Sequence, residues 1–272
     1  MKKVISLALF GEGDRYAQYL PSFVRAHANI FPVEEGWQLC IHVDRLVAAT
    51  YGALLQRYEE AGILAITKME SAPLAKAMLW RMAPIFHMAA GYVFCRDIDA
   101  VPMPRDRACC EAFMHSDCTV HTIHDNKAHT GIMGGLCGFY APIFKTEMGV
   151  WSFNELLFYA KKTTEEWSKH GTDQDVLNRL INRRGGPAVC EHRFSGWFMG
   201  PGPRENAAVP GRYGGGGRSA LVPDRWGSWP ERADLLGSHL GCAGYDHVAA
   251  RAFWDEHGEA ELTRTIAACE DA

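Results

Sequence analysis

The chain has 272 residues, of which 47% are hydrophobic and 22% are charged, the composition of an ordinary soluble globular protein. This length is enough for one large α/β domain with a sizeable core. The formal net charge of −4 provides no general attraction to phosphate backbones or anionic membranes, which argues against nucleic acid as a partner. No apolar stretch approaches the length of a bilayer crossing, so we expect no membrane span.

The N-terminal segment and the cysteines indicate the compartment. The segment MKKVISLALFGEGD contains two lysines and an apolar run, but the run is short and no small-residue cleavage site follows it. We therefore interpret it as a first strand rather than a signal peptide. The nine cysteines form no CxxC pair. We expect reduced, mostly buried thiols and a cytoplasmic location.

The N-terminal half alternates predicted strands with predicted helices, a pattern typical of a mostly parallel sheet flanked by helices. Such sheets bind ligands at the carboxyl ends of their strands. Polar residues that follow strands, at 11–14, 44 and 96–99, should therefore gather on one edge. The predicted strands are 4–10, 38–44, 63–67 and the segment YVFCRDID (92–99); the predicted helices are 16–30, 47–61 and 73–90.

The second half is less regular, and it shows no internal repeat and no clean domain boundary. Its composition becomes loop-rich from Gly185 onward, with a segment at 201–219 that is dense in proline and glycine. The predicted elements are a strand at 118–125, a glycine-rich apolar segment at 132–140, one or two helices over 147–170, a helix over 173–182 and a terminal helix pair over 251–269.

Two carboxylates, Asp97 and Asp99, follow the buried strand around Val93 in the segment VFCRDIDAV. Residues i and i+2 of an extended strand point the same way, so both side chains can face one cavity. As the strand gives way to a turn, both can also reach one hard divalent cation. The alternative is a capping Asp and a turn Asp before Pro102, since a bare Asp-x-Asp is common.

Three segments resemble a known enzyme family. LAKAMLWRMAPIF…GYVFCRDIDAVP resembles the nucleotide-sugar part of metal-dependent glycosyltransferases of the GT-A fold, in which an Asp-x-Asp closes a strand and holds Mn²⁺ or Mg²⁺ against the donor diphosphate. GTDQDVLNRL (171–180) resembles the Asp-Gln-Asp helix start of the retaining family 8, which includes glycogenin and lipopolysaccharide galactosyltransferases. GSHLGCAGY (237–245) resembles that family's late His-x-x-Gly, with a spacing one residue shorter.

The resemblance implies a single glycosyltransferase domain over 1–272, with a Rossmann-like GT-A sheet and a loop-rich C-terminal part. Residues 1–110 would be the nucleotide-binding half and residues 111–272 the sugar and acceptor half. The implied activity is metal-assisted, retaining transfer of a hexose from a UDP-linked nucleotide sugar to a glycan or another hydroxyl acceptor. The implied cofactor is Mn²⁺ or Mg²⁺.

The resemblance also implies roles for particular side chains. The implied metal ligands are Asp97, Asp99 and His239. The implied catalytic residues, which would lie near the reactive sugar carbon or the sugar hydroxyls, are Gln174, Asp173, Asp175 and Asp125. The implied donor-binding residues are Phe10, Gly11, Asp14, Tyr16, Asp44, Lys76, Arg81, Asp97, His124, Gly134 and Gly135.

Several of these residues also have ordinary structural explanations. Acidic side chains in a first helical turn after Thr172 as N-cap favour the helix dipole without any substrate. Lys76 and Arg81 could lie on the solvated face of an amphipathic helix, although Arg81 is set in an apolar stretch and could meet a phosphate or the first Asp. His239 could be a loop histidine. Zinc is a further alternative, with His115, Cys118, His121 and His124 at intervals of three, but a strand would turn these side chains to alternate faces.

Two rival functions use similar residue types. A sugar-nucleotide pyrophosphorylase shares the nucleotide fold and a carboxylate-held Mg²⁺, but it needs a glycine-rich phosphate loop where this chain has only GEGDR. A non-catalytic carbohydrate-binding module of degenerate GT-A type is the other rival, and the intact DxD and DQD motifs argue against it.

Overall fold

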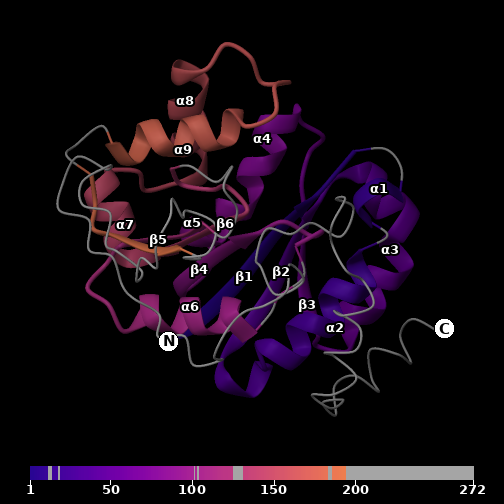
Figure 1. Ribbon diagram of the computed structural model, residues 1–272. Helices are drawn as coiled ribbons and strands as arrows, with labels where there is room; N and C mark the ends of the chain where they lie inside the picture. The colour runs from indigo at the N-terminus through magenta and orange to yellow at the C-terminus, as the bar shows by residue number, and fades with distance from the viewer. Residues whose placement is uncertain are drawn as a thin grey trace, which may run out of the picture.

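The structure, a computed structural model, describes residues 1–11, 14–17, 19–100, 102, 104–124, 131–182 and 186–193. In this part of the chain seven strands form one sheet in the order β3-β2-β1-β4-β6-β5-β7, with helices on both faces (Figure 1). All neighbouring strands are parallel except where β6 pairs with β4 and β5. The predicted α/β class, a mostly parallel sheet flanked by helices, is confirmed. The strands are β1 Lys2–Leu9, β2 Trp37–Val43, β3 Leu64–Lys68, β4 Ala90–Arg96, β5 Val120–His124, β6 Leu136–Tyr140 and β7 Val189–Arg193.

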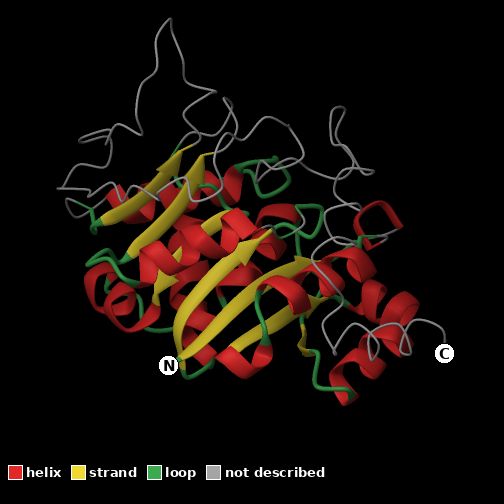
Figure 2. Ribbon diagram, turned by 60° about the horizontal axis from the view of Figure 1, so that its bottom comes forward, coloured by secondary structure: helices red, strands yellow, loops and turns green. Residues whose placement is uncertain are grey.

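The helices cover two faces of the sheet, as Figure 2 shows, and they fill the connections between parallel strands. The described helices are α1 Asp14–Ala17, α2 Leu20–Ile30, η1 Val33–Glu35, α3 Arg45–Glu60, α4 Leu74–Met78, η2 Leu79–Met82, α5 Pro84–His87, α6 Pro104–Met114, α7 Ala141–Met148, α8 Phe153–Thr163 and α9 Thr172–Asn182.

The strands are buried on both faces, which explains why they read as nearly continuous apolar runs. Successive residues of β4 alternate between two cores: Val93 and Cys95 pack with residues of η2, α5 and α7 to α9, whereas Phe94 packs with residues of α2, α3 and α6. A strand with one polar face could not form apolar contacts with the helices on both sides of the sheet. The two cores together hold the carboxyl edge of the sheet in a fixed position.

The segment 73–90 differs from its prediction. It is not one helix but a short α4, the 3-10 helix η2 and a short α5, and β4 already begins at Ala90. Pro84 at the start of α5 lacks the N–H that a continuous helix would need there. The break turns Arg81 inward, since all four residues of η2 are buried.

Other boundaries follow local chemistry. The predicted helix 16–30 is two helices, with Pro21 in the first turn of α2. The region 147–170 contains the end of α7, a left-handed Gly149 at φ 60° that caps it, and α8. The proline- and glycine-dense segment 201–219 and the predicted helix pair 251–269 lie outside the described residues.

The seven cysteines in the described part of the chain are buried and form no disulfide bond. None of the helices described combines the length and the hydropathy that a bilayer crossing requires.

Candidate active site

The carboxylate pair lies in a turn at the carboxyl end of β4. The strand ends at Arg96, and the N–H of Ala100 donates to the carbonyl of Asp97 at 3.1 Å, which closes the turn. Asp97 and Asp99 therefore lie in a turn after the strand, so the prediction that strand alternation points both side chains the same way is wrong. The Asp97 side chain is 28% exposed, so it faces both the interior and solvent.

Arg81 joins this turn to the start of α9. Its guanidinium donates to Asp97 Oδ1 through Nη1 and to Asp173 Oδ2 through Nη2, the latter at 2.8 Å. The Arg81 and Asp173 side chains are only 3% and 5% exposed. We call these three residues the carboxylate–arginine cluster. It connects two motifs that lie far apart in the sequence, and it confirms that Arg81 meets the first Asp of the DxD.

The charge of the cluster follows from its burial. Burial lowers the pKa of the Arg81 guanidinium, but the carboxylates of Asp97 and Asp173 raise it by more, so this pKa lies above its ordinary value. Arg81 is thus a permanent cation. The cluster therefore holds one buried cation between two carboxyl groups at the edge of the sheet.

Two glycines form the wall of the cluster. A Cβ on Gly134 would lie 2.5 Å from Asp173 Oδ2 and 2.9 Å from Arg81 Nη2, and a Cβ on Gly135 would overlap the Asp97 carboxylate. No side chain fits at either position without displacing the charged groups. The sequence predicted that these glycines let the backbone approach donor-sugar hydroxyls; in the structure the groups that they approach are the side chains of Asp97, Asp173 and Arg81.

The first turn of α9 divides its polar residues between interior and solvent. Asp173 is buried in the cluster, Gln174 is half-buried with its side chain beside Gly134, and Asp175 is exposed. Thr172 is the first residue of α9 rather than the expected N-cap before it, and its hydroxyl donates to the carbonyl of Glu166 at 3.1 Å. The dipole explanation therefore suits Asp175, whereas Asp173 has a specific ion-pair partner.

The nucleotide side of the predicted site lies after β1 and β2. Asp44 caps α3: its Oδ1 accepts from the N–H of Val47 at 2.9 Å, and its Oδ2 accepts from the N–H of Gly11 at 3.1 Å. Gly11 takes a left-handed conformation with φ 89°. Asp44 thereby ties the end of β1 to the start of α3, and each carboxylate oxygen has a protein partner.

Two aromatic residues flank this loop. Phe10 packs edge to face on Trp80, with ring centroids 5.6 Å apart, which links the end of β1 to the segment that carries Arg81. Tyr16 on α1 is 42% exposed. Asp14 begins α1, but its side chain is outside the part of the chain that is described.

Lys76 and His124, two further residues of the predicted donor site, have different surroundings. Lys76 is half-buried on α4, the helix before η2. His124 ends β5 and is 1% exposed; its Nε2 lies 2.5 Å from the carbonyl of Gly131 and its Nδ1 lies 2.6 Å from Glu191 Oε1. Both ring nitrogens of His124 therefore meet protein groups rather than an open cavity.

Two predicted residues, Asp125 and His239, lie outside the described residues. Within the residues that are described, no three or more His, Cys, Asp and Glu side chains gather as a possible metal cluster. The donor chemistry of the turn nonetheless fits a hard divalent cation, because Asp97 and Asp99 offer carboxylate oxygens two residues apart. Arg81 shares one of the Asp97 oxygens.

Sequence reasoning missed the role of one polar residue in this region, Asn178, and it expected Arg96 to pair with a carboxylate or with the donor without naming the partner. Asn178 on α9 hydrogen-bonds the backbone of Ile132, and Arg96 forms a buried ion pair with Asp106 at 2.6 Å. The only signal for Asn178 was its place in DQDVLN. The partner of Arg96 is ten residues away across a turn, and no periodicity indicates it.

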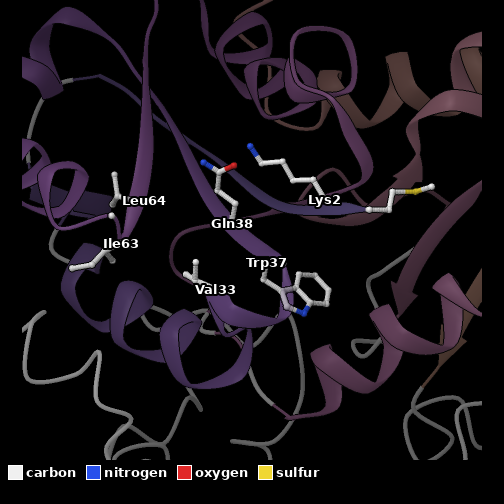
Figure 3. Close-up of a pocket in the computed structure, with 9 residues that line it drawn as sticks. Lys2, Val33, Trp37, Gln38, Ile63 and Leu64 are labelled. Atoms are coloured by element: carbon white, nitrogen blue, oxygen red, sulfur yellow. The ribbon is translucent and has the colours of Figure 1, made fainter.

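A hollow lies at the edge of the sheet opposite to the cluster. It has a volume of about 410 Å³ and is lined by the first residues of β1, β2 and β3, including Lys2, Trp37, Gln38 and Leu64 (Figure 3). These are the amino ends of parallel strands. It is therefore distinct from the cluster at the carboxyl edge, where open α/β sheets place their ligands.

Comparison with known proteins gives likeness in fold alone. No protein-family model matches the sequence, and no curated protein matches it. Among solved structures, the chain is similar to the mannosyltransferase PcManGT from Pyrobaculum calidifontis, which was solved in complex with GDP-Man and Mn²⁺. The two share 14% sequence identity, and the TM-score is 0.45. The match covers 70% of this chain and 56% of that chain.

Two further solved structures are similar to the same degree. S. aureus TarS (residues 1–349) shows 10% identity and a TM-score of 0.47 over 72% of this chain and 58% of that one. The glycosyltransferase GlyE of Streptococcus pneumoniae shows 10% identity and a TM-score of 0.45 over 71% and 45%. This chain thus spans about half the length of the structures it matches. At these scores the likeness is one of chain path, and it assigns no activity to this chain.

Proposed function

We propose that the protein is a metal-assisted glycosyltransferase that takes its sugar from a nucleotide-sugar donor. The observation that carries the proposal is the Arg81 bridge. It holds Asp97 of the DxD turn and Asp173 of the DQD helix start at one point of the carboxyl edge. The sequence resemblance of those two motifs to retaining family 8 glycosyltransferases supports the same reading.

The donor would lie along the carboxyl edge, from the β1 and β2 ends to the cluster. Phe10, Gly11 and Tyr16 would border the nucleoside, with Asp44 holding the loop in place. We propose a UDP-linked donor and a glycan or other hydroxyl acceptor. In this arrangement the diphosphate would reach the turn of Asp97 and Asp99, close to the buried cation of Arg81.

The divalent cation would be held by Asp97 and Asp99, with His239 as a further proposed ligand. When bound, Mn²⁺ or Mg²⁺ would stabilise the negative charge that builds on the diphosphate as it leaves. Arg81 has a separate task, because its fork keeps Asp97 and Asp173 at a fixed separation before any ligand arrives. This preorganisation avoids moving charges during the reaction.

The sugar would lie over the Gly134–Gly135 backbone, beside Gln174. Transfer breaks the bond between the anomeric carbon and the diphosphate oxygen, which leaves with the electron pair, and forms a bond from that carbon to the acceptor oxygen. The hydroxyl proton of the acceptor passes to the leaving diphosphate or to water. We propose retention of anomeric configuration, with Gln174 and Asp173 beside the reactive carbon. Asp125 and Asp175 would contribute at the sugar hydroxyls.

The deciding experiment is a panel of UDP- and GDP-sugars incubated with the protein, with Mn²⁺ or with EDTA. We expect at least one donor to release free nucleoside diphosphate only with Mn²⁺, faster when a glycan acceptor is added. A bound donor at a hundredfold its Kd should also raise stability by about 2.7 kcal/mol in a thermal shift.

Other outcomes would identify the rivals. Formation of nucleoside triphosphate from pyrophosphate and a nucleotide sugar would indicate a pyrophosphorylase. Donor binding with no turnover and no hydrolysis would indicate a binding module. A product of opposite anomeric configuration by NMR would show an inverting enzyme and exclude the proposed place of Gln174.

A further inference from the structure

The segment that carries the two wall glycines is short and closely packed. Residues 131–135 run from Gly131, with φ 68°, to Gly135 just before β6; we call them the glycine strap. The side chain of Ile132 is fully buried in the core that also contains Val176 and Leu177 of α9. The strap therefore lies between α9 and the carboxylate–arginine cluster.

Asn178 binds the backbone of this strap with both ends of its amide. Its Oδ1 accepts from the N–H of Ile132 at 2.9 Å, and its Nδ2 donates to the carbonyl of Ile132 at 3.2 Å. Nδ2 also donates to the carbonyl of Gln174, one turn earlier in α9, at 2.7 Å. A side chain that accepts and donates toward one residue imitates the pairing of a neighbouring strand.

The fit around the Asn178 amide is close. A Cβ on Gly131 would lie 2.5 Å from Asn178 Oδ1, so only glycine allows this approach. Asparagine is a poor residue for the interior of a helix, since its amide competes for backbone hydrogen bonds. Here the amide makes one hydrogen bond within its own helix and two to the backbone of Ile132, which points to a role in placing that segment.

We propose that Asn178 is a positioning residue for the donor site: it fixes the glycine strap, and hence Gly134 and Gly135, against Asp97 and Asp173. The inference rests on the proposed function, since the strap would border the donor sugar. Ile132 burial alone holds the strap near α9, but apolar contact is non-directional. The two hydrogen bonds to the Ile132 backbone set its register along the helix.

The test uses Asn178→Asp, which keeps the shape but replaces the donating Nδ2 by an oxygen that faces two carbonyl oxygens. We expect kcat with a saturating nucleotide sugar to fall about tenfold to a hundredfold, because small misplacements of reacting groups cost rate on that scale. UDP binding should stay within about threefold of the wild type, because the nucleoside contacts lie at the β1 and β2 ends.

A second test measures the hydrogen-exchange rates of backbone amides in Asn178→Ala and does not depend on enzyme turnover. The Ile132 N–H should exchange about tenfold faster in Asn178→Ala, while the Tyr140 N–H, which donates to the carbonyl of Thr119 at 2.9 Å away from the strap, should be unchanged. The matched control is Asn182→Ala, an exposed asparagine on the last turn of the same helix. It should leave kcat and both exchange rates as in the wild type.

The outcomes separate this inference from the proposed function. If the wild-type protein turns over no nucleotide sugar, both the proposed function and the positioning role of Asn178 are wrong. An active wild type with unchanged kcat in the two Asn178 variants, or with equal losses of kcat and UDP affinity, overturns only the positioning role.

Discussion

Two buried arginines close to the β4 end are held in opposite ways. Arg96 is 1% exposed, and its N–H groups go to Asp106, to the carbonyls of Cys95 and Cys137, and to the Cys110 sulfur. Both members of the Arg96–Asp106 pair are closed off from solvent. Such a pair has no group left to offer to a ligand.

Arg81 is equally buried but divides its guanidinium between two carboxylates from different segments, and one of them, Asp97, reaches solvent. Two buried arginines near the carboxyl end of β4 thus have different roles. The closed Arg96 pair supports the architecture, and the open Arg81 cluster presents charge at an edge where a ligand can meet it. Exposure of the partner carboxylate, rather than burial of the arginine, separates the two.

The largest expected effect is on the closed pair. Asp106→Asn leaves the Arg96 charge buried without its counter-ion and should lower the free energy of unfolding by about 3–5 kcal/mol. Asp97→Asn should lower it much less, because Arg81 keeps Asp173 and the position is part-exposed. Urea denaturation measures both, and equal losses would contradict the distinction.

Acid should destabilise the interior through the buried side chain of His42. Burial, with a smaller effect of nearby His87, lowers the pKa of His42 to about 4 from an ordinary 6.5. The unfolded chain therefore binds the extra proton first, so stability is full above pH 6.5 and falls as the pH approaches 4, by an amount on the order of 3 kcal/mol.

The matched variants for this pH effect are His42→Asn and His115→Asn, the latter at an exposed position. Stability measured between pH 7 and 4 should fall less steeply in His42→Asn than in the wild type, and His115→Asn should follow the wild type. Identical slopes in all three proteins would show that His42 is not held neutral.

Activity should depend on the planar, two-donor geometry of the Arg81 guanidinium. Arg81→Lys keeps the charge but cannot bridge Asp97 and Asp173 with two parallel donors. Loss of one charge-assisted hydrogen bond, about 1.5–3 kcal/mol, should lower kcat/KM about tenfold to a hundredfold. The control is Arg179→Lys on the exposed face of α9; a similar loss there would remove the special role of Arg81.

The smallest expected effect comes from one methyl group. Gly135→Ala forces its Cβ into the Asp97 carboxylate and should lower turnover about tenfold through misplacement of that side chain. Gly52→Ala on α3 meets nothing within 4 Å and should instead stabilise by about 0.5–1 kcal/mol with activity unchanged. Activity assays and thermal unfolding of the two variants show whether crowding matters only at the cluster.

The sequence predicted the sheet better than the site. Apolar runs located β1 to β4 within two residues at their starts, because strands buried on both faces carry a continuous signal. The prediction of one helix over 73–90 was wrong, because the apolar spacing there is also compatible with short helical segments that are interrupted at Pro84. Tertiary packing, rather than local propensity, decided that region.

The parts of the cluster were recognised by residue type but not by partner. Asp97, Arg81 and Asp173 were each singled out, yet nothing local indicates that residues 92 positions apart share a hydrogen bond. His124 was expected at the donor, whereas the structure surrounds it with Gly131 and Glu191. Long-range pairing depends on how α9 packs on the sheet, which a single sequence does not encode in its periodicity.

The most direct test of the central claim is calorimetric titration of UDP, with Mn²⁺ and with EDTA, into the wild type and into Asp97→Asn. The account predicts that UDP binds the wild type more tightly with Mn²⁺, and that Asp97→Asn loses about tenfold or more of this metal-dependent affinity while its circular dichroism is unchanged. Equal UDP affinity with and without Mn²⁺, or undiminished metal-dependent binding in Asp97→Asn, would contradict the claim that the DxD turn is the donor site.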